Sequence, residues 1–152
     1  MREIPTFHYL VRAIIERDGQ YLLTKERGSD FSFLPGGHVE PGEPAVVALQ
    51  RELREELGVT GRVGAFVGAI EHAWSDARGQ ARQEVNLLFR VAAESLGGPE
   101  LASREPHLEV FWCEPAAFAR VDLRPEPARR LLARAAWEAG AWWASTLHDV
   151  GG

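Results

Sequence analysis

The stretch between Pro44 and Gly58 constrains the fold of this chain most, because it carries the marks of a helix with one apolar side. Pro44 suits the first turn of a helix, and Gly58 suits the stop at its C-terminal end. The apolar positions between them recur at helical spacing and are Val46, Leu49, Leu53 and Leu57. We therefore expect an amphipathic helix that packs its apolar side on another layer of structure.

Three glutamates lie close together on this expected helix. With about 100° of rotation per residue, Glu55 falls at about −60° and Glu56 at about 40° from Glu52, so all three share one side. Like charges at this spacing cost roughly 0.2–0.5 kcal/mol per pair on an exposed helix. Glu56 also borders the apolar stripe, where an unpaired carboxylate is unfavourable. Arg51 can pair with Glu55, but one guanidinium does not neutralise three carboxylates.

Two interpretations of this acidic side are open from the helix alone. A helix rich in glutamate and arginine is commonly a solvated surface with ion pairs. A divalent cation would offset the same charge, since Mg²⁺ takes oxygen ligands and is held by a few carboxylates together with substrate phosphates. The preceding Gly36 and Gly37 favour the cation, because glycines let the backbone come close to a ligand. We expect a metal and a phosphate bound side by side, with both glycines in contact with substrate.

The rest of the chain alternates between strand and helix patterns. Asp18-Gly19 is a hairpin turn signal between two apolar stretches. The expected strands cover residues 7–16, 20–25, 62–72, 83–93 and 108–113, and a short strand over 33–37 breaks into a glycine-rich turn. A short helical turn is expected at 116–120 and a final helix over 126–145. This order predicts one α/β domain over residues 1–152, with a mixed sheet between helical layers.

Composition narrows the class of protein. The 152 residues, 45% hydrophobic and 26% charged, suit one globular domain. Cys113 is the only cysteine, which fits a reducing compartment. No signal peptide and no run of about 18 apolar residues is present, so we expect a cytoplasmic protein without a membrane segment. The net charge of −5 argues against duplex nucleic acid as a partner, but not against a small phosphorylated ligand.

The residues from Gly37 to Val59 resemble the Nudix signature. Gly37 is followed after five residues by Glu43, and after seven more by the sequence Arg51-Glu52-Leu53-Arg54-Glu55-Glu56-Leu57-Gly58, so every specified position is filled. The resemblance implies a loop–helix–loop catalytic element on an α/β/α sandwich. It also implies hydrolysis of a nucleoside diphosphate linked to another group, by attack of water on a diphosphate phosphorus.

The same resemblance assigns roles to residues. It implies that Glu52, Glu55 and Glu56 bind Mg²⁺ or Mn²⁺ with help from the Gly37 carbonyl group, and that Arg51 and Glu43 support this geometry. Members of the family take their general base either from the first glutamate of the helix, here Glu52, or from a later glutamate. Two later candidates are Glu105, in the loop before the 108–113 strand, and Glu84, which alternation places with Asn86 on the more polar face of its strand.

Several residues are candidates for binding the remainder of the substrate. Trp74, in a polar turn context, is the best candidate to stack on a base, and Lys25 and Arg27 could reach phosphates. Core packing is the preferred role for Phe31, Phe33 and Trp112, and a structural role for His8 and His72. The Trp142–Trp143 pair would cover the core or form a homodimer contact.

The expected substrate is a small-molecule diphosphate, with nucleoside triphosphates and nucleotide sugars both open. One alternative is a nucleotide-binding or regulatory protein that kept the fold and lost catalysis, although such a protein has no need of all three glutamates. A diphosphate isomerase is a further alternative, although this chain has no candidate catalytic cysteine near the acidic helix.

Overall fold

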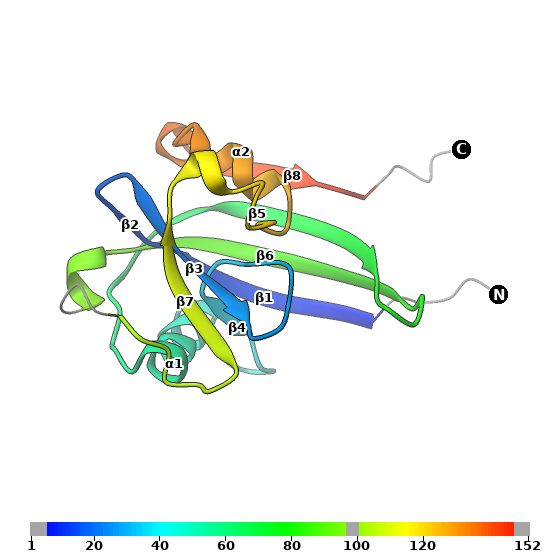
Figure 1. The fold of residues 1–152 in the computed structure, drawn as a ribbon, viewed down its shortest axis with the longest axis horizontal. Helices are drawn as coiled ribbons and strands as arrows, with labels where there is room; N and C mark the ends of the chain where they lie inside the picture. The colour runs from blue at the N-terminus through cyan, green and yellow to red at the C-terminus, as the bar shows by residue number, and fades with distance from the viewer. Residues whose placement is uncertain (1–5, 97–100, 148–152) are drawn as a thin grey trace.

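A computed structural model describes residues 6–96 and 101–147 as two sheets and two α-helices (Figure 1). The larger sheet has the order β4-β1-β6-β5-β8 and is mixed, because β1 pairs in parallel with β6 and β8 in parallel with β5. Its strands are β1 (Thr6–Ile14), β4 (Gly36–His38), β5 (Val63–Ser75), β6 (Ala81–Val91) and β8 (Trp142–Ser145). The smaller antiparallel sheet contains β2 (Glu16–Arg17), β3 (Gln20–Glu26) and β7 (Leu108–Cys113).

The two α-helices lie on opposite sides of the strands, as expected for a sandwich (Figure 1). They are α1 (Ala45–Leu57) and α2 (Pro127–Ala133), and short 3-10 turns occupy Ala93–Leu96, Pro115–Ala117 and Ala136–Ala139. Asp18 and Gly19 both have positive φ, 51° and 79°, which is the backbone that a tight hairpin turn requires. No helix in the described ranges is long and apolar enough to cross a membrane.

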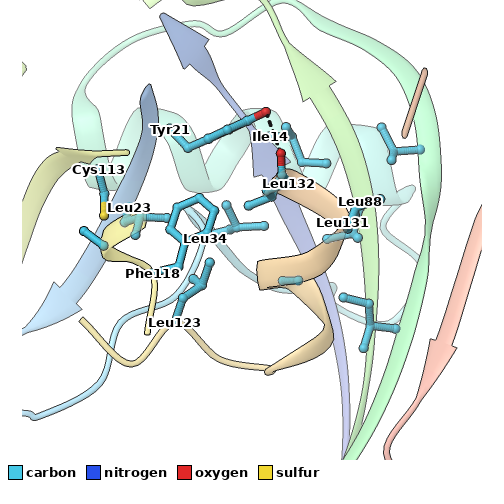
Figure 2. Packing of buried hydrophobic residues seen from close by; sticks show 14 residues of the cluster. Ile14, Tyr21, Leu23, Leu34, Leu88, Cys113, Phe118, Leu123, Leu131 and Leu132 are labelled. Atoms are coloured by element: carbon cyan, nitrogen blue, oxygen red, sulfur yellow. Dashed lines mark hydrogen bonds between the residues drawn. The ribbon is translucent and has the colours of Figure 1, made fainter. Parts of the chain in front are cut away.

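The sheet separates two apolar cores, and alternate residues of β1 contribute to each. Val11 and Ala13 pack in the core beneath α1, whereas Ile14 packs in the core beneath α2. Figure 2 shows the α2-side core, where the hydroxyl group of Tyr21 donates to the carbonyl oxygen of Leu132 at 3.2 Å. Because both faces of the strands are covered, β1 reads as a nearly continuous apolar run.

The expectation of a final helix over 126–145 is wrong. The chain forms α2 over only seven residues, then a 3-10 turn, and then β8 along the edge of β5. Ala135 (φ 46°) and Gly140 (φ 118°) both leave the helical region, so the helix cannot continue. A side chain at Gly68 would collide with the backbone of Trp142, so a glycine is needed where β8 docks. Apolar spacing suited a helix, but pairing with a sheet edge decided the outcome.

The two tryptophans of β8 face opposite sides of the sheet. Trp142 packs against the α2-side core, whereas Trp143 is 62% exposed. The core-covering role is therefore confirmed for Trp142. The homodimer contact stays a prediction for Trp143.

Candidate active site

The packing of α1 places Glu56 in a buried position. Leu49, Leu53 and Leu57 enter the α1-side core, and Glu56 on the shoulder of this stripe is only 4% exposed. Its Oε2 accepts a hydrogen bond from the backbone N–H of Gly36 at 3.2 Å. Burial raises the pKa of Glu56 to about 8, despite the opposing charge of Arg12. The ionised carboxylate is therefore costly to keep here without a cation.

The glycine turn makes room for protein groups. A Cβ atom at Gly37 would lie 2.6 Å from the carboxyl carbon of Glu52, and one at Gly36 would collide with the carbonyl oxygen of Val11. Gly36 also has φ 141°, which residues with side chains rarely adopt. We expected a turn that ends a strand. Instead Gly36–His38 is itself β4, paired with β1, and its glycines let the acidic helix and the sheet edge approach closely.

Arg51 connects the segment before α1 with the acidic side of the helix. Its Nε donates to Glu43 Oε2 at 2.8 Å and its Nη2 to the His38 carbonyl oxygen at 3.0 Å. Its Nη1 donates to Glu52 Oε1 at 3.0 Å and Glu55 Oε1 at 3.3 Å. The hydrogen bond from Arg51 holds the pKa of Glu43 near 2. The guanidinium group therefore fixes the loop against the helix, and Glu56 is not among its hydrogen-bond partners.

The residues of this cluster fit a hard divalent cation by their chemistry. The side-chain atoms available as metal ligands are all carboxylate oxygens, which Mg²⁺ and Mn²⁺ prefer. Burial raises the pKa of Glu52 as well as that of Glu56, so two carboxylates are held where their charge is poorly solvated. Within the described residues, no three acidic, histidine or cysteine side chains already converge as ligands. Arg51 holds Glu52 and Glu55 in the present arrangement.

Arg12 lies within electrostatic range of the acidic cluster and lines the cavity on the α2 side of the sheet. It projects from β1, and its guanidinium group donates to the Leu34 carbonyl oxygen at 3.1 Å and to Asn86 Oδ1 at 3.5 Å. Burial lowers its pKa, while the charges of Glu56, Glu84 and Glu52 act in the opposite direction. Arg12 was not among the site residues predicted from the sequence. The available signal was a charged residue inside the apolar run of β1.

A cavity of about 680 Å³ opens beside Arg12 on the α2 side of the large sheet. Its base consists of side chains from β1, β5 and β6, and the segment before α2 forms another wall. The Arg124 guanidinium lies 4.5 Å from the ring centre of Phe31. A pocket of this size with aromatic walls and a few polar groups suits a nucleotide-sized ligand. Its lining includes His8, Arg12, Phe31, His72, Trp74, Glu84, Asn86 and Arg124.

The predicted substrate-binding residues lie in different places. Trp74 is 42% exposed and lines the cavity, and so does Phe31, for which we preferred a core role. His8 and His72, interpreted as structural, also line it. Lys25 and Arg27 are absent from the lining among the described residues. Arg27 instead donates to the Pro106 carbonyl oxygen at 2.7 Å. The positively charged side chain of Arg12 lines the cavity and lies near the acidic cluster.

Glu105 and Glu84, the two general-base candidates outside the acidic helix, lie in different parts of the structure. The backbone N–H of Arg104 donates to the Glu56 carbonyl oxygen at 2.7 Å, which anchors the neighbouring Glu105 at the end of α1. The Glu105 carboxylate lies 3.0 Å from His107 Nε2, is 30% exposed, and contributes to the raised pKa of Glu56. Glu84 instead lies at the base of the cavity, where Asn86 Nδ2 donates to its Oε1 at 3.2 Å.

The fold and this site define a class of protein, the α/β sandwiches with an acidic loop–helix–loop element at the sheet edge. A family model described as the NUDIX domain matches residues 6–135. The CTP pyrophosphohydrolase of Escherichia coli K12 is 39% identical over 126 residues, covering 71% of this chain and 93% of that relative. The nucleoside triphosphatase NudI of Escherichia coli O1:K1 / APEC is 48% identical over 125 residues, covering 75% and 86%.

A solved structure supports the same assignment. The solution structure of the E. coli ORF135 protein matches with a TM-score of 0.62 and 33% sequence identity, over 89% of this chain and 93% of that one. The chain therefore belongs to the Nudix family and is a Nudix hydrolase. Nudix hydrolases generally use divalent metal ions.

Proposed function

We propose that this protein hydrolyses a phosphoanhydride bond of a nucleoside diphosphate derivative, with Mg²⁺ or Mn²⁺ as cofactor and a nucleoside triphosphate as the preferred substrate. Water adds across the bond, so that the products are a nucleoside monophosphate and pyrophosphate. The observation that carries the proposal is the buried Glu56 carboxylate beside Glu52, next to a nucleotide-sized cavity. Relatives that include a CTP pyrophosphohydrolase and a nucleoside triphosphatase support the substrate class.

In this proposal the acidic helix holds the cation. Glu52, Glu55 and Glu56 supply carboxylate oxygens, and the Gly37 carbonyl group supplies a further ligand. The bound cation would polarise a phosphoryl oxygen and lower the pKa of a coordinated water. Arg51 keeps Glu52 and Glu55 in register with the loop through its bonds to these two carboxylates, to Glu43 and to the His38 carbonyl oxygen. The acidic helix and its loop would thus form a rigid support for the cation, and the cation would balance the negative charge of the three glutamates.

We assign the role of general base to Glu105. Its loop is hydrogen-bonded to the end of α1, so its carboxylate stays close to the acidic cluster. Glu52 is the other candidate, but its oxygens are needed for the cation in this proposal. Glu84 projects into the cavity and bonds to Asn86, away from the loop that carries Glu105. Glu105 would accept the proton that the attacking water loses as it bonds to phosphorus.

The cavity would hold the nucleoside. Trp74 and Phe31 offer aromatic faces for stacking, and Arg12 lies between the cavity and the acidic cluster, where it would face the phosphate groups. Lys25 and Arg27 would contact only those phosphates that project out of the site. We expect the enzyme to act in the cytoplasm on free nucleotides, without duplex nucleic acid or a membrane as partner.

A substrate panel tests the proposal. The purified protein is incubated with Mg²⁺ or Mn²⁺ and with nucleoside triphosphates, nucleotide sugars or ADP-ribose, and pyrophosphate and nucleoside monophosphate are quantified. We expect turnover of a triphosphate that the Glu56→Gln variant loses by orders of magnitude. The matched control is Glu114→Gln, an exposed glutamate before the 115–117 turn, and it should leave the rate unchanged. Nucleotide binding without turnover of any compound would favour the regulatory alternative.

A further inference from the structure

Glu84 occupies the centre of a polar row across the base of the cavity. In the sheet register, His8 of β1 and His72 of β5 are both paired with Glu84 of β6. Side chains at paired positions point to the same face of a sheet, and all three residues line the cavity. The next row toward the acidic cluster is mostly apolar, with Leu10 and Ile70 on either side of Asn86. Glu84 is therefore an acceptor group on the base of the cavity, between the row of Asn86 and the row of Trp74 and Arg82.

Asn86 holds the Glu84 carboxylate in place. Asn86 is 1% exposed, its Nδ2 donates to Glu84 Oε1 at 3.2 Å, and its Oδ1 accepts from Arg12 Nε at 3.5 Å. A guanidinium on one side and a carboxylate on the other allow only one orientation of the amide. Hydrogen bonds thus connect Arg12, Asn86 and Glu84 along the base of the cavity. The second carboxylate oxygen of Glu84 has no hydrogen-bond partner within the described residues.

The spacing along the strands fits a nucleotide. Arg12 is paired with Leu88 and His8 with Glu84, so the two rows are four residues apart, or about 13 Å at roughly 3.3 Å per residue. If the phosphates lie beside Arg12 and the acidic helix, the base reaches the row of Glu84. A carboxylate offers only acceptors, so it selects a base edge that presents N–H donors.

We propose that Glu84, positioned by Asn86, accepts a hydrogen bond from the 4-amino group of cytosine or the 6-amino group of adenine and makes the enzyme selective for these nucleotides over uracil and hypoxanthine nucleotides, which carry a keto oxygen at that position. This inference rests on the proposed function, because it uses the same cavity for the nucleoside. A keto oxygen at the same position would face the carboxylate without a proton between them, which a site in an apolar pocket rejects strongly.

Selectivity ratios test the inference. For wild type and Glu84→Gln, kcat/KM is measured for CTP against UTP and for ATP against ITP. We expect the wild type to prefer the amino base by about tenfold or more, and Glu84→Gln to lose most of this preference through KM, with kcat for CTP largely kept. Asn86→Ala should reduce the same ratio, because it releases the carboxylate. Glu114→Gln is the control and should keep the wild-type ratios.

A binding measurement separates this inference from the proposed function. Affinities for CMP and UMP are measured by calorimetry without any metal, on the same variants, with circular dichroism to establish folding. Preferential CMP binding that depends on Glu84 supports the inference even if the wild type hydrolyses nothing, an outcome that would overturn only the proposed function. Unchanged CMP-to-UMP ratios in both Glu84→Gln and Glu84→Asp would overturn the inference. So would an equal loss of kcat on every nucleotide with unchanged affinities, which would make Glu84 the general base.

Discussion

The side chain of Glu56 reaches from the acidic helix to the backbone N–H of Gly36, and this 3.2 Å hydrogen bond joins α1 to the edge strand β4. Among the described residues, this N–H group is the one hydrogen-bond donor to a carboxylate that is almost fully buried. Burying this charge costs free energy, and a bound cation would reduce that cost. Both effects can be measured on the protein without knowing its substrate.

The stability of the metal-free protein should fall as pH rises from about 6.5 to 8. Glu56 has a folded pKa of about 8 against an ordinary value of 4.5, so the folded state binds more protons than the unfolded state across this range. Glu52, whose pKa is also raised, acts with the same sign. Each pKa unit is worth about 1.4 kcal/mol. Urea unfolding at several pH values in EDTA measures the effect.

Two comparisons control this prediction. Glu56→Gln should reduce the dependence and leave the smaller contribution of Glu52, and saturating Mg²⁺ should restore stability to the wild type at pH 8. Carboxylates with lowered pKa, such as Glu43, act only below about pH 4.5. Burial lowers the pKa of His38 and His72, which act with the opposite sign below about pH 6.5, so the fall is measured between about pH 6.5 and 8. A wild-type curve that rises with pH in EDTA over this interval would contradict the account.

Gly37→Ala should damage activity more than stability. The added Cβ would lie 2.6 Å from the Glu52 carboxyl carbon, so that side chain must move away from the glycine turn. Misplacement of a catalytic group by about 1 Å can cost on the order of a hundredfold in rate. Steady-state hydrolysis and thermal unfolding are measured in parallel. Gly64→Ala, whose new atom meets nothing closer than 3.5 Å, is the matched control, and equal rates for the two variants would refute this placement of Glu52.

Glu105→Gln should lower kcat by about 10²–10⁴-fold, the usual contribution of a general base. Metal affinity should change little, because Glu105 is not assigned as a ligand. The measurement is kcat at saturating Mg²⁺ for wild type and variant, with Mn²⁺ affinity determined on the same two proteins. If Glu105→Gln keeps its rate while Glu52→Gln loses it with metal still bound, the base is Glu52.

Gly68→Ala should destabilise the fold by about 1–3 kcal/mol, the usual cost of overpacking. The new methyl group collides with the Trp142 backbone and pushes β8 away from β5. Because the 142–145 strand lies at the far edge of the sheet from β4, kcat under folded conditions should stay close to wild type. Urea midpoints give the first quantity and initial rates the second. Full stability in the variant would mean that β8 does not dock at this position.

The sequence predicted those parts of the fold in which local pattern and tertiary packing agree. The spacing of Leu49, Leu53 and Leu57 and the stop at Gly58 gave α1, and the placement of Glu56 on its shoulder followed from helical rotation alone. The pattern failed for residues 126–145, where the spacing suited a helix but Trp142 and Trp143 pair with a strand far away in the chain. No local signal reports the free edge of β5 that receives them.

The site was predictable only where its residues lie in one segment. Glu52, Glu55 and Glu56 follow one another on α1, so their proximity could be calculated. Arg12 and Asn86 come from strands that are distant in sequence, and their meeting depends on the parallel register of β1 and β6. His8 and His72 have apolar neighbours in sequence, which suggested a structural role. Each does hydrogen-bond another side chain, His38 and Thr146 respectively, and both also line the cavity.

The most direct test of the central claim is a titration with Mn²⁺ followed by electron paramagnetic resonance, which reports free and bound ion without any substrate. The account predicts that wild type and Glu114→Gln bind Mn²⁺ alike, and that Glu56→Gln, still folded by circular dichroism, binds at least about tenfold more weakly, since each tenfold is about 1.4 kcal/mol. Equal Mn²⁺ affinity in wild type and Glu56→Gln would contradict the claim that this buried carboxylate holds the cation.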